Sequence, residues 1–514
     1  MRLDYIDLQT TSKTKYFKTY MLSSSNSRQA TWVAIGQFSA FAIGVISPMI
    51  LSRYFTKVDY GTYKQVMYVY NTMLIVFTFG LPKAYSYFIP RVHILQSKDV
   101  INKISRIFVI LGLIFSLLLF FGASLISNVL NNPDIEDAVR WFSPTPLFLL
   151  PVMGLEGILV SYKKAKHIAL FTFVTRLLTL LCTIVPVILF DGTYIHSIIG
   201  FDIASLVTCA LSYYLKYLPT RGLSHERTEV SYKEIFSFSL PLLFASLWIM
   251  LFQSTNQFFV SRYYGNEVFA EFSNGFMDLP IIPMVINSVA TVIAPIFAGL
   301  AVNNKGEIGP IWNSALSKTV KIIYPISMYC ILFSGIVMTC LYGRQYADSG
   351  VFFSIKSIEG FFSVIPFYPI LMAMGKTREY SRVHMIFAVV LIPIDYILVH
   401  FSAPVYSIGI AYVFCSLCKV FFQFKTVGRS LDYSISQLIP IKEILKILFI
   451  SFLSTLIPFA LLHVIAGVNE WILLLITGSL FFLGYYVLCW MTNLTYRDVI
   501  LLNEKLKPIL KFIP

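Results

Sequence analysis

The sequence is short of charged residues: Asp, Glu, Lys and Arg make up 13% of its 514 residues, whereas 57% are hydrophobic. A soluble globular protein carries roughly 25% charged residues, so this chain lacks the polar surface that a water-soluble fold needs. Apolar runs of about 20 residues, long enough for a helix to cross a membrane, recur along the chain. The composition therefore predicts a polytopic membrane protein.

Cysteine is also scarce, and all seven cysteines lie in apolar runs. The stretch "CSLC", from Cys415 to Cys418, has the spacing of a redox motif, but it sits in an apolar run without a histidine partner. The sequence thus predicts neither a disulfide framework nor a redox site. No short apolar region with a small-residue cleavage site precedes the first long run, so we expect no cleaved signal peptide.

The apolar runs predict an all-α fold with about fourteen transmembrane helices. The predicted spans are 32–52, 66–89, 105–127, 141–162, 168–190, 195–215, 235–259, 274–300, 320–341, 352–374, 383–401, 405–424, 444–466 and 470–490. Every connection between them is short. The longest internal connection, "KYLPTRGLSHERTEVSYK" (216–233), follows the sixth span.

That connection predicts a boundary between two six-helix lobes. We expect six parts: a polar cytoplasmic N-terminus (1–31), an N-terminal lobe (32–216), a cytoplasmic linker (217–234), a C-terminal lobe (235–425), two last helices with their preceding loop (426–490) and a cytoplasmic tail (491–514).

Basic residues outnumber acidic ones, 40 to 26. With both termini placed in the cytoplasm, the cytoplasmic segments hold 30 of the 40 Lys and Arg residues, and four more lie inside spans. The opposite face holds only Arg53, Lys57, Lys64, Arg140, Arg262 and Arg344. This split follows the positive-inside rule, so the basic excess reflects topology and contact with anionic membrane lipids. It does not point to nucleic acid.

The two predicted lobes contain a weak internal repeat. "SRYFTKVDYGTY" (52–63) follows the first span and "SRYYGNEVFAEF" (261–272) follows the seventh, at a constant offset of 209 residues. Ser, Arg and Tyr are identical, and three further aromatic positions match. An even number of spans per lobe makes the repeats parallel, as in transporters whose two lobes flank a central cavity.

The stretches "LSRYFTKVDYGTY" and "GLPKAYSYFIPR" (80–91) resemble the opening of bacterial polysaccharide flippases. These belong to the multidrug/oligosaccharidyl-lipid/polysaccharide exporter superfamily. The resemblance implies a fold similar to that of the multidrug and toxin extrusion transporters, with spans 1, 2, 7 and 8 lining a central cavity. Fourteen spans also look like those of the lipid II flippases, in which the last two spans form a groove for the lipid tail.

The implied function is alternating-access transfer of undecaprenyl-pyrophosphate-linked oligosaccharide across the bacterial inner membrane, for O-antigen, capsule or exopolysaccharide synthesis. The implied partners are this glycan lipid, the surrounding membrane lipids and the polysaccharide polymerase machinery. We expect a monomer without cofactor or metal.

A pyrophosphate headgroup needs fixed cations in a low-dielectric environment. Lys83 lies inside the second span, where an unpaired lysine costs about 2.5–3.5 kcal/mol and is rarely idle; snorkelling to the interface is the alternative. Arg53 and Arg262 close the outer ends of spans 1 and 7, where they could grip phosphate oxygens or act as interfacial anchors. Lys356 and Glu359, three residues apart, form a possible ion pair in span 10.

The glycan would need hydrogen-bonding side chains, for which Asn71 and Asn256 in spans 2 and 7 are candidates. Asp278 in span 8 is a further candidate for the substrate site, with a structural charge pair as the alternative. Asn and Gln in spans also bond one helix to another, so packing is the alternative. Glu156 and Arg176 lie at a similar depth in spans 4 and 5. Since an isolated buried charge is costly, we expect these two to form a buried pair.

Two other functions remain open. A cation-coupled multidrug antiporter of the same fold would favour acidic cavity residues, but the candidate set is mostly basic. A membrane glycan polymerase or ligase would carry a large external loop with catalytic residues, and no such loop or constellation is present. We therefore expect a transporter rather than an enzyme.

Overall fold

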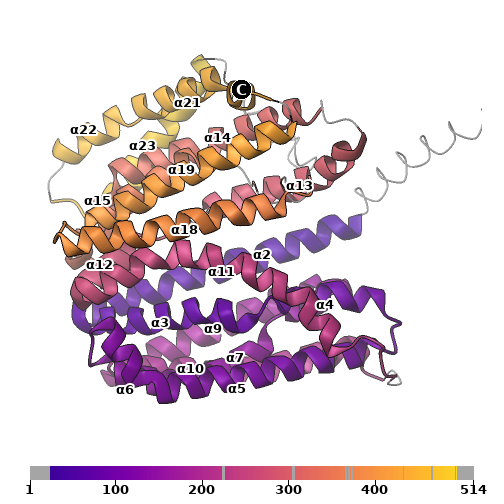
Figure 1. Ribbon diagram of the computed structural model, residues 1–514. Helices are drawn as coiled ribbons and strands as arrows, with labels where there is room; N and C mark the ends of the chain where they lie inside the picture. The colour runs from indigo at the N-terminus through magenta and orange to yellow at the C-terminus, as the bar shows by residue number, and fades with distance from the viewer. Residues whose placement is uncertain are drawn as a thin grey trace, which may run out of the picture. The chain divides into compact units, whose positions relative to one another are not determined.

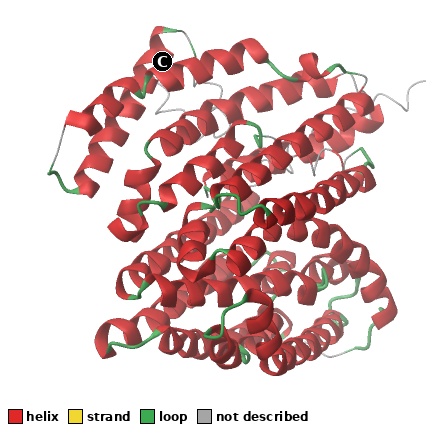
Figure 2. Ribbon diagram, turned by 60° about the vertical axis from the view of Figure 1, so that its left-hand side comes forward, coloured by secondary structure: helices red, strands yellow, loops and turns green. Residues whose placement is uncertain are grey.

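The computed structural model describes residues 24–222, 226–279, 281–303, 307–364, 367, 371, 374–431, 433–464, 467–492 and 494. Within these residues, every regular element is an α- or 3-10 helix (Figures 1 and 2). The predicted all-α fold is thus confirmed. Most of the predicted N-terminal segment 1–31 and nearly all of the predicted tail 491–514 lie outside the described residues.

The helices lie over the predicted spans, but several spans, such as 141–162 and 444–466, are divided into two or more helices. The first half holds α2 (Ser24–Tyr54), α3 (Lys57–Thr78), α4 (Pro82–Phe88), α5 (Ser97–Leu130), α6 (Ile135–Phe142), α7 (Thr145–Leu149), α8 (Leu155–Ser161), α9 (Ala165–Phe190), α10 (Tyr194–Tyr217) and α11 (Tyr232–Tyr263). The second holds α12 (Gly265–Gly275), α13 (Ile281–Asn303), α14 (Ile308–Leu332), α15 (Ser334–Tyr342), α16 (Ser349–Ser357), α18 (Thr377–His400), α19 (Tyr406–Leu431), α20 (Ile435–Leu438), α21 (Ile441–Leu453), α22 (Leu456–Val464) and α23 (Glu470–Met491).

Eleven segments of the described chain are long and apolar enough to cross a membrane. The predicted spans 1 and 8 coincide with two shorter apolar helices, Phe38–Tyr54 and Ile281–Ala290. The predicted span 10 (352–374) falls on α16, on a 3-10 helix (Ile358–Phe361) and on residues partly outside the described chain. The chain is therefore a multi-pass membrane protein.

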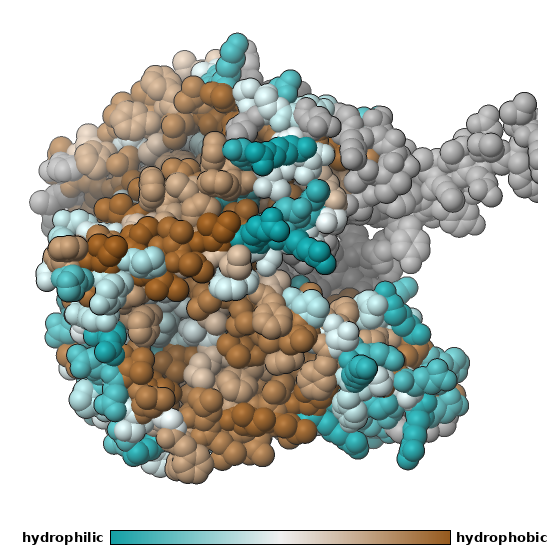
Figure 3. Space-filling model, viewed as in Figure 1, coloured by the Kyte–Doolittle hydropathy of each residue, from teal (hydrophilic) through white to brown (hydrophobic). Residues whose placement is uncertain are grey.

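Exposed apolar side chains cover the middle of the long helices. On α5 these include Ile110, Leu113, Phe121 and Leu125. Figure 3 shows apolar residues, in brown, along the helix middles and hydrophilic residues, in teal, near the helix ends. Helices that cross a hydrocarbon layer have this distribution.

The second predicted span is interrupted rather than continuous. The break between α3 and α4 contains Phe79 and Gly80, whose φ angles are 54° and 69°. A Cβ atom at position 80 would lie 2.8 Å from the carbonyl oxygen of Ser239, so this left-handed turn and its close approach both favour glycine. Pro82 then begins α4, where a missing N–H costs nothing.

The described chain forms two compact units. Unit 1 comprises Met1–Phe55, Val66–Asn128 and Pro133–Leu247, and unit 2 comprises Thr56–Gln65, Val129–Asn132 and Trp248–Pro514. In unit 1, α9 packs along both α2 and α10. In unit 2, α14 packs on α21, α18 packs on α19, and the main core surrounds the fully buried Trp312.

The 209-residue repeat has a structural counterpart. Helix α2 ends at Tyr54 and α11 ends at Tyr263, at the same offset. The matched aromatic residues Tyr60 and Phe269 are both fully buried. Gly61 lies close to the backbone of Asn266: a Cβ atom at position 61 would come 2.1 Å from the Asn266 carbonyl oxygen. Equivalent positions thus have equivalent surroundings.

Candidate functional site

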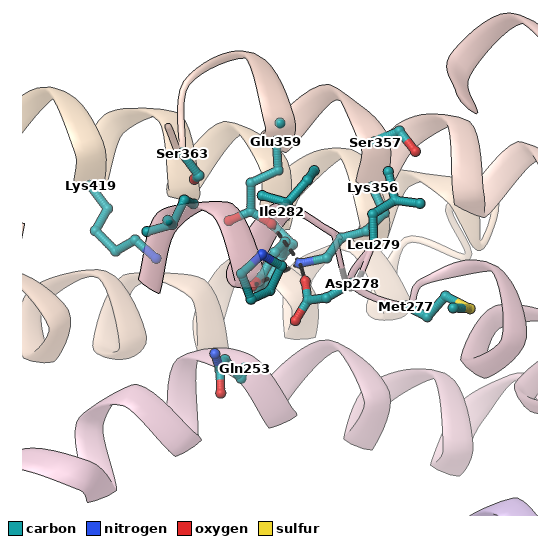
Figure 4. Close-up of a pocket in the computed structure, with 14 residues that line it drawn as sticks. Gln253, Met277, Asp278, Leu279, Ile282, Lys356, Ser357, Glu359, Ser363 and Lys419 are labelled. Atoms are coloured by element: carbon teal, nitrogen blue, oxygen red, sulfur yellow. Dashed lines mark hydrogen bonds and ion pairs between the residues drawn. The ribbon is translucent and has the colours of Figure 1, made fainter. Parts of the chain in front are cut away.

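Unit 2 contains a cavity of about 170 Å3. Its walls come from α11, the chain between α12 and α13, α13, α16, the following 3-10 helix and α19 (Figure 4). The polar side chains on these walls are Gln253, Asp278, Lys356, Ser357, Glu359, Ser363, Tyr412 and Lys419. Two cations and two carboxylates thus face one space among membrane-crossing helices.

An ionic cluster forms the floor of the cavity. The ammonium of Lys356 lies 2.5 Å from Glu359 Oε2 and 2.9 Å from Asp278 Oδ1. It also donates to the hydroxyl of Tyr412 at 3.4 Å. The other oxygen of Glu359 accepts from the Ser416 hydroxyl at 2.6 Å. Lys356 is only 9% exposed, so these contacts replace the water that its charge has lost.

The two carboxylates reach Lys356 in different ways. Glu359 is three residues further along, where the end of α16 runs into the 3-10 helix and the two side chains share a face. The pair expected from the sequence is therefore present. Asp278 comes from the chain before α13 and is 67% exposed along its side chain. This second carboxylate can leave the cluster at lower cost because solvent can hydrate it.

Lys419 on α19 is the second cation of the cavity. Its ammonium lies 4.2 Å from the centre of the Phe252 ring, a cation–π contact. Among the described residues, it makes no hydrogen bond and no ion pair. In Figure 4 the side chain reaches toward the space between Glu359 and Gln253. Lys419 thus forms part of the cavity wall.

A second polar network lies within unit 2, between its segment 56–65 and residues 261–274. Lys57 pairs with Glu271 at 2.5 Å, and the hydroxyl of Tyr60 donates to Asn274 at 2.9 Å. The side-chain amide of Gln65 donates to the Ser261 hydroxyl at 2.9 Å. These bonds tie the charged hinge after α2 into unit 2.

The predicted cationic residues occupy different surroundings. Lys83, on the first turn of α4, is exposed and has no hydrogen bond or ion pair within the described residues. Arg53 is exposed and donates to the Met49 carbonyl. Arg262 is half-buried, donates to the Val129 carbonyl and lies 5.4 Å from the Tyr263 ring. Arg53 and Lys83 belong to unit 1, and Arg262 to unit 2.

The predicted polar residues also lie in different surroundings. Asn71 on α3 is exposed. Asn256 on α11 is fully buried; its oxygen accepts from the Gln257 backbone, whereas its nitrogen has no partner. Asp278 alone of this predicted set lines the cavity. The predicted pair of Glu156 and Arg176 does not form: both side chains are exposed, and no ion pair joins them.

The sequence does not predict the complete burial of two charged residues, Lys216 and Asp395. Lys216, which the sequence assigns to a cytoplasmic segment, is fully buried at the end of α10. Asp395 on α18 is fully buried, and neither of its carboxylate oxygens has a hydrogen-bond partner among the described residues. The described residues contain no group of three His, Cys, Asp or Glu side chains that could hold a metal ion.

A charged cavity thus lies among apolar helices of membrane-crossing length. The chain belongs to the polysaccharide biosynthesis protein family, whose model matches residues 27–301. The relationship expected from the hinge motifs is confirmed. No curated protein matches the chain in sequence.

Solved structures extend this likeness to almost the whole chain. The lipid II flippase MurJ in an inward closed conformation matches with a TM-score of 0.72 and 15% identity, covering 91% of this chain and 99% of that one. An inward-facing MATE family multidrug resistance transporter of the MOP superfamily matches with a TM-score of 0.60 and 12% identity, covering 78% and 94%. A MOP superfamily transporter from Pyrococcus furiosus matches at 0.56 and 13%, covering 79% and 95%. At these identities the likeness establishes the fold.

Proposed function

We propose that the chain is a flippase for polysaccharide synthesis that moves undecaprenyl-pyrophosphate-linked oligosaccharide across the bacterial cytoplasmic membrane. The observation that carries the proposal is the family match over 27–301, combined with a fold match to the lipid II flippase MurJ over 91% of the chain. In this proposal both termini are cytoplasmic, and alternating access carries the headgroup from the cytoplasmic to the outer leaflet.

The distribution of cations supports an anionic headgroup. Lys83 and Arg53 are exposed on the surface of unit 1, and phosphate oxygens bind lysine and arginine well. Arg262, the counterpart of Arg53 in the repeat, is more enclosed because it also bonds to the Val129 carbonyl. We propose that Lys83 takes up the pyrophosphate and that Arg53 and Arg262 act at the exit.

The size and lining of the unit 2 cavity support a more limited role for it. A volume of about 170 Å3 is below the roughly 300 Å3 at which ligand pockets begin, so only part of an oligosaccharide would enter. Gln253, Ser357 and Ser363 offer hydrogen bonds to sugar hydroxyls beside the ionic cluster. We propose that this cavity contacts a sugar residue rather than the pyrophosphate.

A multidrug antiporter of the same fold is the second candidate. The exposed carboxylate of Asp278 favours it, because a cationic drug would be attracted to an accessible acid. The two candidates differ in the charge of the substrate: the antiporter would carry cations and the flippase an anionic glycan lipid.

The test is the sidedness of lipid-linked oligosaccharide in cells depleted of the protein. A membrane-impermeant glycan-modifying enzyme reports which headgroups face outward. We expect depletion to trap the glycan lipid on the cytoplasmic side, and wild-type protein to restore its outward exposure. Lys83→Ala should restore at most a tenth of it, whereas Lys166→Ala, which removes an exposed lysine from the start of α9, should restore it fully.

Normal outward exposure in depleted cells, with glycan left unpolymerised, would instead point to an enzyme that acts after translocation. Full rescue by Lys83→Ala would remove Lys83 from the headgroup site.

A further inference from the structure

Asp395 on α18 is a buried acid without a partner. Asp395 is 0% exposed, and neither carboxylate oxygen has a hydrogen-bond partner within the part of the chain that the structure describes. An ionised carboxylate in such a place would lose its hydration and gain nothing in return. Charged groups inside membrane-crossing helices almost always pair with one another or face water. The isolation of Asp395 therefore fits a neutral, protonated carboxyl group.

The neighbouring groups supply no positive charge. Among the described residues, Tyr264 and Cys415 are titratable groups that lie near Asp395. The Tyr264 hydroxyl already donates to the Ala403 carbonyl at 2.7 Å. Neither group is cationic, so neither stabilises a carboxylate.

The cations of unit 2 are engaged elsewhere. Lys356 pairs with Glu359 and Asp278. Lys419, on the α19 helix that packs against α18, faces the cavity and lies over the Phe252 ring.

The histidines of α18 are also out of reach. His384 is eleven residues away, about 16 Å along the helix axis. His400 is exposed and lies roughly 140° around the helix from Asp395. Its ring stacks on Tyr396 instead. No positively charged or metal-binding group among the described residues thus accounts for the burial of Asp395.

The position of Asp395 along α18 indicates which face of the membrane this residue lies nearer. The first turns of the helix carry Arg378 and Arg382, which the positive-inside rule assigns to the cytoplasm. Asp395 is five residues from the other end, at His400. In the topology of the proposed function, the acid therefore lies near the outer face, where protons enter down their gradient.

We propose that Asp395 is a proton-binding site of the transport cycle. This proposal rests on the proposed flippase function. The carboxylate takes one proton from the outer side and is buried as the neutral acid in the conformation described here. It returns that proton to cytoplasmic water in another conformation. The O–H bond that forms on one side breaks on the other, so one proton crosses inward per cycle and drives the glycan lipid outward.

The first experiment detects the proton without any substrate. Infrared spectra of the purified full-length protein in lipid, recorded in H2O and D2O, contain a carbonyl band for each protonated carboxyl group. We expect Asp395→Asn to lose one such band at neutral pH. Glu136→Gln should lose none, because Glu136 is partly exposed to solvent and its carboxylate is paired with Arg140 at 2.5 Å. An unchanged spectrum in Asp395→Asn would overturn the proposal.

The second experiment links the proton to transport. Asn has the shape of the protonated acid, so Asp395→Asn should fold, and a normal gel-filtration profile will check this. In cells, an uncoupler should reduce outward exposure of the glycan lipid at least tenfold for wild type. Asp395→Asn should already be that low and should not respond to the uncoupler.

The outcomes separate the two proposals. A lost infrared band together with no glycan-lipid transport by wild type would reject the flippase and keep the proton site. Wild-type transport that Asp395→Asn leaves intact and uncoupler-sensitive would reject the proton site and keep the flippase. Dependence on sodium instead of the proton gradient would also overturn the proton assignment.

Discussion

Each unit buries a lysine among its helices, but the two lysines are accommodated by different chemistry. In unit 1, Lys216 is 0% exposed and donates to the Pro151 carbonyl, with Ser105 Oγ at 3.4 Å and the Tyr85 hydroxyl at 3.5 Å. In unit 2, Lys356 is held by the carboxylates of Glu359 and Asp278. One cation is solvated by neutral oxygens, and the other is neutralised by charge.

This difference in surroundings distinguishes Lys216, whose role is structural, from Lys356, whose ion-pair partners can be exchanged. The neutral oxygens around Lys216 belong to three separate helical segments, and the lysine charge joins these segments. The partners of Lys356 line a cavity, and Asp278 is largely exposed. A ligand that enters the cavity can therefore reach the partners of Lys356, whereas Lys216 is fully buried. The buried charge of unit 2 is the one whose partners border an open space.

The largest effect on stability is expected from removing Lys356. Lys356→Met leaves Glu359 buried without its counter-charge, so the free energy of unfolding should fall by about 3–5 kcal/mol. Urea unfolding of the detergent-purified protein measures the change. Adding Glu359→Met should recover most of the loss, because an apolar pair of similar volume removes the unpaired charge. A single variant as stable as wild type would contradict the charge pairing.

A smaller effect is expected from Lys216→Met in unit 1. The substitution strands only the Pro151 carbonyl, because the Tyr85 and Ser105 hydroxyls still bond each other at 2.9 Å. The loss should be about 1–3 kcal/mol, the cost of one unsatisfied buried polar group. The same urea titration measures it, and transport by the folded fraction should stay at the wild-type level. Losses as large as that of Lys356→Met would erase the distinction between the two units.

The sequence predicted the helices and the hinge better than the charges. Apolar runs fix the span positions, and the 209-residue offset locates the ends of α2 and α11 correctly. The Lys356–Glu359 pair could be predicted because three residues along one helix fix a shared face. Asp278 lies 78 residues before Lys356 in the sequence, and no local sequence pattern predicts that these two side chains are in contact.

Burial of Lys216 and Asp395 shows the same limit. Lys216 borders a polar connection, so its position predicts a cytoplasmic charge, yet oxygens from Pro151, Ser105 and Tyr85 surround it. Asp395 lies near a helix end, which suggests an interface, but packing of α18 on α19 accompanies its complete burial. Depth along a helix follows from the sequence, whereas direction around the helix axis depends on tertiary packing.

The smallest effect is expected at Glu156 and Arg176, where sequence and structure disagree. Equal depth suggests a pair, but both side chains are exposed and no ion pair joins them. The stability losses of Glu156→Gln and Arg176→Gln should therefore add within about 0.5 kcal/mol in a double-mutant cycle. A matched cycle on Lys57 and Glu271, which lie 2.5 Å apart, should show coupling above that value. Coupling of about 1 kcal/mol or more between Glu156 and Arg176 would mean that depth alone had identified a true pair, and that unit 1, like unit 2, neutralises a membrane-embedded cation with a carboxylate.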